Sequence, residues 1–113
     1  RLEPRMMEIH FGDFTHRPWA EERAALEAAL AAAEEQGWRL KWAGGESRGD
    51  LYDRVASFHD ELRRDTVIVG HGGSIRMLRA ARLGLKMPEL MHFEAANAGI
   101  VVLTGDGETR HGY

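Results

Sequence analysis

The sequence predicts an α/β fold, because segments with helical spacing of apolar residues alternate with short runs rich in β-branched residues. The chain has 113 residues, of which 43% are hydrophobic and 29% charged. This composition is typical of a single globular domain over residues 1–113. The predicted order of helix, helix, strand, helix, strand favours at least one parallel strand pair. Two or three strands are few for such amphipathic helices, so we expect a sheet with more strands than these segments supply.

The composition disfavours several classes of function. The 15 basic and 18 acidic residues give a net charge of −3, without the basic excess that favours nucleic-acid binding. The chain has no cysteine, which excludes disulfides, thiolate metal sites and cysteine nucleophiles. It has no apolar run long enough to span a membrane, and its first residues are too charged for a signal peptide. We therefore expect a cytoplasmic protein with no nucleic-acid or membrane partner.

Three segments have the pattern of amphipathic helices. The first covers residues 18–36, with a proline in its first turn and a glycine after its end. The second begins near Ser47, which forms a start similar to a capping box with Asp50. Its apolar residues recur at helical spacing, at Leu51, Val55, Phe58 and Leu62. The third covers residues 74–83 and ends at Gly84.

Short strands are predicted between and after these helices. The β-branched run at residues 66–69 has the composition of a strand that is buried on both faces. A second strand is predicted at residues 100–103, followed by a turn at residues 105–107 and a short closing strand at residues 108–113. A short extended piece is expected at residues 6–11, and residues 87–97 are expected to be irregular.

The segment Gly70-His71-Gly72-Gly73 joins the predicted strand at residues 66–69 to the third helix. In open α/β sheets, ligands bind at the carboxyl ends of strands, and a helix N-terminus attracts phosphate. Glycines let a ligand approach the backbone closely, and a histidine cation adds charge-assisted hydrogen bonds. The segment therefore predicts a phosphate site that includes His71. The alternative is a glycine turn beside a histidine with a purely structural role.

Two other interpretations of this segment fit less well. A dinucleotide-binding fingerprint would need a third glycine where the chain has Ile75. The His-Gly-Gly sequence also occurs in the oxyanion loop of lipases, but the chain has no G-x-S-x-G nucleophile elbow.

Glu8 is a second candidate for chemistry. It lies among apolar residues and close to Phe11 in the sequence. A carboxyl group in apolar surroundings can act as a general acid near neutral pH. The alternative is an ordinary exposed glutamate in a loop.

Four segments, in this order, resemble the histidine phosphatase superfamily, which includes phosphoglycerate mutases and many phosphatases. The resemblance is strongest to small bacterial phosphatases of the α-ribazole phosphatase type. The matching segments are Glu8-Ile9-His10-Phe11-Gly12, Gly45-Glu46-Ser47, Arg54-Val55-x-x-Phe58 and Val69-Gly70-His71-Gly72-Gly73-Ser74-Ile75-Arg76.

The resemblance implies a three-layer α/β/α fold with a mostly parallel sheet. It also implies hydrolysis of a small phosphorylated metabolite through a phosphohistidine, with no metal or other cofactor. The implied partners are that substrate or inorganic phosphate, and the resemblance is compatible with a homodimer. A mutase that transfers the phosphoryl group remains an alternative, as does a non-catalytic phospholigand-binding or regulatory protein.

The resemblance also implies roles for individual residues. His71 is the second histidine of the site, which holds the phosphoryl oxygens, and the Gly72 amide lines the same pocket. Glu8 protonates the leaving alcohol. Asn97 is a further pocket residue, and His10 contacts the substrate.

One part of the family pattern is missing. The nucleophilic histidine belongs to an R-H-G motif that ends the first strand and precedes the position of Glu8, but no such motif lies before Glu8 in this chain. We therefore expect the chain to be the C-terminal part of a histidine phosphatase domain and to be inactive alone. Arg110-His111-Gly112 also spells R-H-G, as in a circularly permuted enzyme. Polar, turn-forming residues precede it, which favours coincidence.

Overall fold

A computed structural model gives the structure of parts of the chain. The described residues are 1–16, 18, 20–21, 24, 28, 38–39, 41, 44–85, 89 and 96–113. The helix predicted over residues 18–36 lies mostly outside them; of its described residues, Ala20, Glu21, Ala24 and Ala28 are helical and Pro18 is not. The segment 87–97, predicted to be irregular, also lies mostly outside the described residues.

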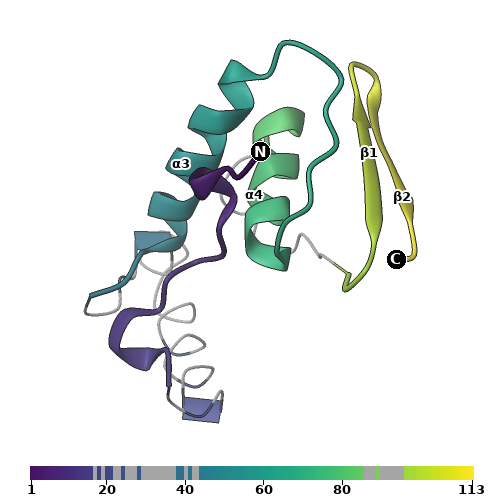
Figure 1. Ribbon diagram of the computed structural model, residues 1–113. Coiled ribbons are helices and arrows are strands. Elements are labelled where there is room, and N and C mark those ends of the chain that lie inside the picture. Colours follow the sequence, from purple (N-terminus) through teal and green to yellow (C-terminus); the bar gives the residue numbers. More distant parts are fainter. Residues whose placement is uncertain are drawn as a thin grey trace.

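The regular elements of the described residues comprise short 3-10 helices, α-helices and one hairpin (Figure 1). In chain order they are η1 (Pro4–Met6), η2 (Gly12–Phe14), α3 (Arg48–Glu61), α4 (Gly72–Leu83), β1 (Ile100–Thr104) and β2 (Gly107–His111). The extended piece predicted at residues 6–11 is wrong in part, because Met6 closes η1 and Phe11 is not extended, although Met7 is.

Helix α3 begins where the sequence predicts. The Ser47 hydroxyl accepts a hydrogen bond from the Asp50 N–H at 3.0 Å, and the Asp50 carboxylate accepts one from the Ser47 N–H at 3.0 Å. This capping box satisfies two N–H groups at the start of the helix. The apolar stripe then buries Leu51 and Val55 almost completely.

Helix α4 lies beside α3 and runs in the same direction (Figure 1). Residues 62–71 lead from the end of α3 back to the end of the helix pair at which α3 begins, and α4 starts there. It begins two residues earlier than predicted and ends at Gly84, whose φ of 68° suits a glycine. The core lies between the two helices. Its buried members are Met6, Trp38, Leu51, Val55, Met77, Leu78 and Ala80.

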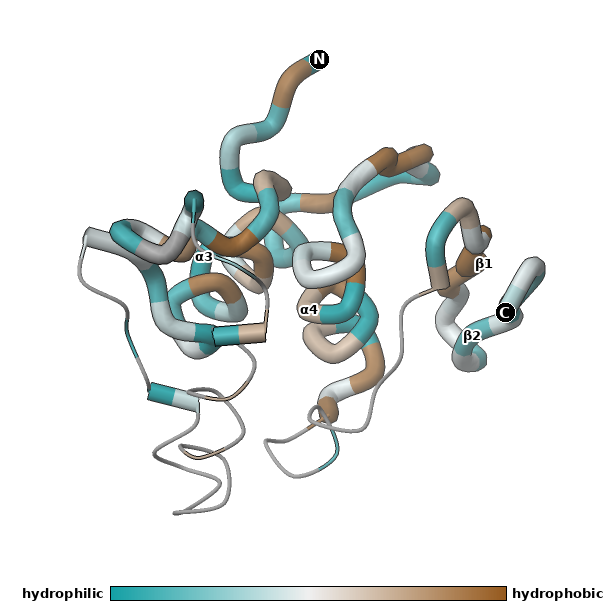
Figure 2. The backbone as a smooth tube through the Cα atoms, turned by 90° about the horizontal axis from the view of Figure 1, so that it is seen from below, coloured by the Kyte–Doolittle hydropathy of each residue, from teal (hydrophilic) through white to brown (hydrophobic). Residues whose placement is uncertain are grey.

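The predicted hairpin is confirmed. Strands β1 and β2 are antiparallel, with Ile100 opposite His111 and Thr104 opposite Gly107. Figure 2 looks along the two helices and shows the hairpin on the other side of α4 from α3. It is tied to α4 by Arg79, which is fully buried and forms a bidentate ion pair with Glu108 at 2.9 and 2.7 Å.

The strand predicted at residues 66–69 is wrong for this structure. The segment is not part of a strand, and Val67 and Val69 are 94% and 92% exposed. Ile68, between them, is partly buried and packs against the core. A strand needs a hydrogen-bonded neighbour, and none of the described residues pairs with this segment as a strand. The composition of the segment suits burial that the described residues do not supply.

The predicted parallel pair is likewise absent from the described residues, whose sheet consists of the antiparallel hairpin. The structure is α/β in content. In the described part of the chain, no helix combines the length and apolar character needed to cross a membrane.

Candidate active site

Glu8 contacts the start of α4, which is 65 residues away in the sequence. Its Oε2 accepts a hydrogen bond of 2.8 Å from the Gly73 N–H, and its Oε1 accepts one of 2.9 Å from the Ile9 N–H. The side chain is half-buried. The structure therefore brings Glu8 against the His71-Gly72-Gly73 segment and contradicts the alternative of an ordinary exposed loop glutamate.

His71 stands immediately before α4, and Ser74 fixes the backbone there. The fully buried Ser74 hydroxyl accepts from the His71 N–H at 3.2 Å and donates to the His71 carbonyl at 3.1 Å. These contacts leave the Gly73 N–H directed out of the helix start, where the helix dipole favours a negative group. The Glu8 carboxylate occupies this position. His71 and Gly72 are both exposed beside it.

Gly73 permits this contact because it has no side chain. A Cβ at Gly73 would overlap the Glu8 carboxyl group. The close approach therefore requires glycine at this position.

The loop at Gly45 and Glu46 packs against the backbone beside Glu8. The Glu46 N–H donates to the His10 carbonyl at 2.7 Å, and the His10 N–H donates to the Glu46 Oε2 at 3.0 Å. A Cβ at Gly45 would lie 2.5 Å from the His10 carbonyl oxygen and 2.8 Å from the Gly12 nitrogen, which are backbone atoms. Gly45 is therefore needed for the two loops to meet.

The His10 imidazole is held by its own loop. Its Nδ1 accepts a hydrogen bond of 3.0 Å from the Gly12 N–H, which leaves Nε2 as the ring nitrogen available to another partner. The side chain is exposed.

Arg54 of α3 joins Glu46 to the segment that carries Glu8. Its Nε and Nη2 donate to the two Glu46 carboxylate oxygens at 2.7 and 2.9 Å. Its Nη1 donates to the carbonyls of Arg5 and Met7, and its Nη2 also donates to the Glu8 carbonyl. The Arg54 guanidinium lowers the pKa of Glu46 below its ordinary value.

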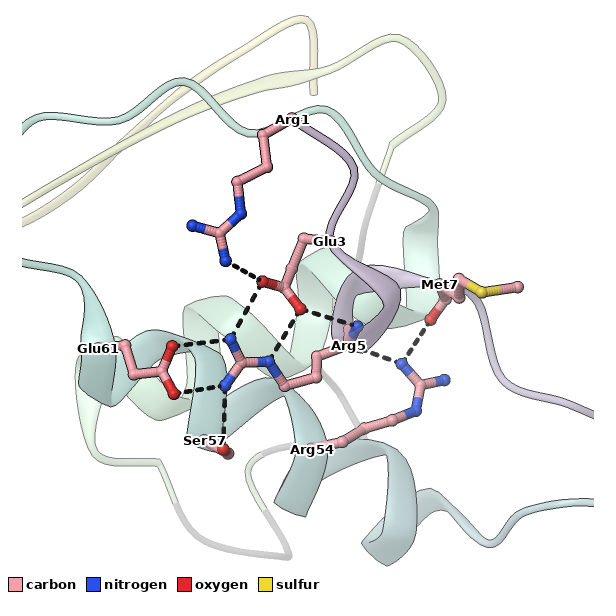
Figure 3. Close-up of polar contacts among 7 residues, drawn as sticks. All are labelled: Arg1, Glu3, Arg5, Met7, Arg54, Ser57 and Glu61. Atoms are coloured by element: carbon pink, nitrogen blue, oxygen red, sulfur yellow. Dashed lines mark hydrogen bonds and ion pairs between the residues drawn. The ribbon is translucent and has the colours of Figure 1, made fainter.

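The N-terminal segment is fastened to α3 a second time by Arg5 (Figure 3). Its guanidinium donates to both Glu3 and Glu61, with shortest distances of 2.8 Å, and it lies over the Phe58 ring at 5.5 Å. The Arg5 side chain holds the pKa of Glu3 down at about 2. The segment that leads to Glu8 is thus anchored along most of its length.

The hydrogen bonds of Glu8, His71 and Gly73 involve neither Asn97 nor the second R-H-G sequence. Asn97 is exposed in the turn before β1. Arg110 and His111 end the exposed strand β2, and the Arg110 guanidinium lies over the Tyr113 ring at 5.7 Å. This hairpin gives His111 no buried strand behind it, which agrees with reading the second R-H-G sequence as a coincidence.

The sequence patterns assigned no role to Glu46 and Arg54, although both stand in segments that resemble the family. Three of the groups that Arg54 contacts are backbone carbonyls 46–49 residues away. No side-chain pattern marks a carbonyl, so only the fold could show this cluster.

A model of the histidine phosphatase superfamily (branch 1) matches residues 1–111. The chain belongs to this superfamily. It is also similar to a curated protein of Mycolicibacterium vanbaalenii, a glucosyl-3-phosphoglycerate phosphatase, with 37% identity over 100 residues. The match covers 74% of this chain but 42% of that relative, so the chain spans less than half the length of the relative.

Proposed function

We propose that this histidine phosphatase chain holds and protonates a phosphate monoester of a small metabolite, within a longer protein that supplies the nucleophilic histidine. The observation that carries the proposal is the contact between Glu8 and the Gly73 N–H. It puts a carboxyl group beside His71 and a helix N-terminus, the two kinds of group that favour a bound phosphoryl anion.

In the proposed reaction, His71 and the amides at the start of α4, including that of Gly72, hold the phosphoryl oxygens. The nucleophilic histidine, from an R-H-G motif outside this chain, attacks phosphorus, and the bond from phosphorus to the ester oxygen breaks. The Glu8 carboxyl donates its proton to the leaving alkoxide. Water then attacks the phosphohistidine while Glu8 accepts a proton from it, and inorganic phosphate leaves.

The structure supports the proposed role of His10 more than that of Asn97. His10 stands two residues from Glu8, and its exposed ring uses Nδ1 within its own loop, so its Nε2 is available for a hydrogen bond to the substrate. Asn97 has no contact with the site in the described residues, and its proposed place in the pocket rests on the resemblance alone.

The proposed substrate is a small phosphorylated metabolite. The relative is named for a glucosyl-3-phosphoglycerate, so a phosphoglycerate linked to a sugar is the first compound to test. Free inorganic phosphate as product supports a phosphatase, whereas a phosphoglycerate with its phosphoryl group moved supports a mutase.

The proposal is tested with the full-length protein that contains this chain. We expect His71→Ala to lower the kcat for p-nitrophenyl phosphate by at least about 100-fold, because positive and N–H donors stabilise the transferring phosphoryl group. His59→Ala, a change of the same kind on α3, should leave the activity unchanged. Unchanged activity in His71→Ala would contradict the site, and an inactive full-length protein that still binds phosphate would favour the non-catalytic alternative.

A further inference from the structure

Arg54 uses its complete set of hydrogen-bond donors inside the protein. A guanidinium has five N–H groups in one plane, and Arg54 makes five hydrogen bonds. They go to the two oxygens of Glu46 and to the carbonyls of Arg5, Met7 and Glu8, at 2.7–3.1 Å. Figure 3 shows the guanidinium directed at the Met7 carbonyl. No N–H group of Arg54 remains for a substrate.

Glu46 fixes the backbone on the C-terminal side of Glu8 as well. Its two oxygens are occupied by Arg54 and by the His10 N–H, and its own N–H donates to the His10 carbonyl. The backbone is therefore held before Glu8, at Glu8 itself and after it. The two side chains are only 21% and 24% exposed, so water screens their charges less than it screens a surface pair.

These contacts of Arg54 and Glu46 matter for Glu8 because the Glu8 side chain contacts a second segment of the protein. Its carboxyl group must meet the Gly73 N–H across the gap between two segments, and a side chain can do so only from a backbone in a fixed position. A displacement of about 1 Å in a catalytic group costs about 100-fold in rate. Lysine cannot replace the arginine, because its compact ammonium lacks the planar array of donors.

We propose that Arg54 and Glu46 are positioning residues that hold Glu8 in place as the proton donor, without touching the substrate. This inference rests on the proposed function, because it assumes that Glu8 protonates the leaving group.

The test exploits the leaving group. An alkoxide needs a proton to leave, whereas p-nitrophenolate leaves readily without one. In the full-length protein, we expect Arg54→Lys to lower kcat/KM for glycerol phosphate by about 100-fold and for p-nitrophenyl phosphate by less than about 10-fold. A purely structural role would lower both values by the same factor, and that result would overturn the proposal.

Three further variants complete the design. Glu8→Gln should show the same dependence on the leaving group, and if it does not, the proposed function fails and the positioning role fails with it. If Glu8→Gln shows the dependence and Arg54→Lys does not, the positioning role alone is overturned. Glu46→Gln keeps the shape of the side chain and should show a weaker form of the Arg54→Lys pattern, which is decisive if Arg54→Lys does not fold. Arg79→Lys disturbs another buried arginine–glutamate pair and should change both esters equally. A selective loss in Arg79→Lys would overturn the proposal.

Discussion

Gly73 is the residue at which the candidate site has least room. Its N–H supplies the hydrogen bond to Glu8, and the carboxyl group occupies the space that a Cβ would need. The side chain of Glu8 is flexible and can move, whereas the start of α4 is fixed by the buried Ser74 hydroxyl. A larger residue at position 73 should therefore displace Glu8 and leave the helix in place.

We predict that Gly73→Ala lowers kcat/KM for an alkyl phosphate by about 100-fold in the full-length protein, because the proton donor is moved. Its thermal unfolding temperature should be unchanged or higher, since alanine favours a helix over glycine. Gly105→Ala is the matched control, because a Cβ there meets no atom within 4 Å. Full activity in Gly73→Ala would mean that the Glu8 contact is not needed for the reaction.

At the scale of elements, local signals predicted α3, α4 and the hairpin well. The capping box of Ser47 and Asp50 and the glycine at position 84 lie within a turn of the ends that they mark. The strand predicted at residues 66–69 from local composition is wrong, because strand formation depends on neighbouring strands rather than on the segment itself. Without such neighbours, Val67 and Val69 of this β-branched run are exposed to solvent.

The ion pair between Arg79 of α4 and Glu108 of β2 predicts how stability depends on pH. Arg79 lowers the pKa of Glu108 below its ordinary value of 4.5. A carboxyl group with a lowered native pKa adds stability that is fully present above pH 4.5 and is lost as the pH falls through its native value. We therefore expect the urea midpoint of unfolding to fall between pH 5 and pH 3.

The variant Glu108→Gln should reduce that fall in the full-length protein. We expect it to be less stable than the parent at pH 7, by about 1–3 kcal/mol, because a buried hydrogen bond loses its charged partner. The difference should shrink at pH 3. Asp106→Asn removes the same charge from the exposed turn next to β2 and serves as the control. An equal pH dependence in the parent and in Glu108→Gln would contradict this role of the pair.

At the scale of the whole molecule, the contact between Glu8 and Gly73 could not be predicted from spacing. The two residues are 65 positions apart, and no periodicity links them. The resemblance to the family implied one site for Glu8 and His71, and the structure supplied the contact between Glu8 and Gly73. For Arg54 and Glu46, neither spacing nor the resemblance predicted a role. Their partners are largely backbone atoms, which no sequence motif represents.

We propose that residues 66–69 are an inner strand of a three-layer α/β/α domain in the longer protein. The chain spans 42% of the length of its relative, and the two exposed valines and the unpaired backbone suit a further strand. Hydrogen exchange at residues 66–69 should therefore be fast in a chain of residues 1–113 and strongly slowed in the full-length protein. Equally fast exchange in both would contradict the proposed strand. The short chain should also lack phosphatase activity.

The most direct test of the central claim, that Glu8 at the start of α4 is the proton donor, uses Glu8→Gln in the full-length protein. Its kcat/KM is measured against a series of phosphate monoesters whose leaving alcohols differ in acidity. We predict a loss that grows from p-nitrophenyl phosphate to alkyl phosphates and reaches at least about 100-fold. A loss of the same size for every ester, or none at all, would contradict the assignment of Glu8.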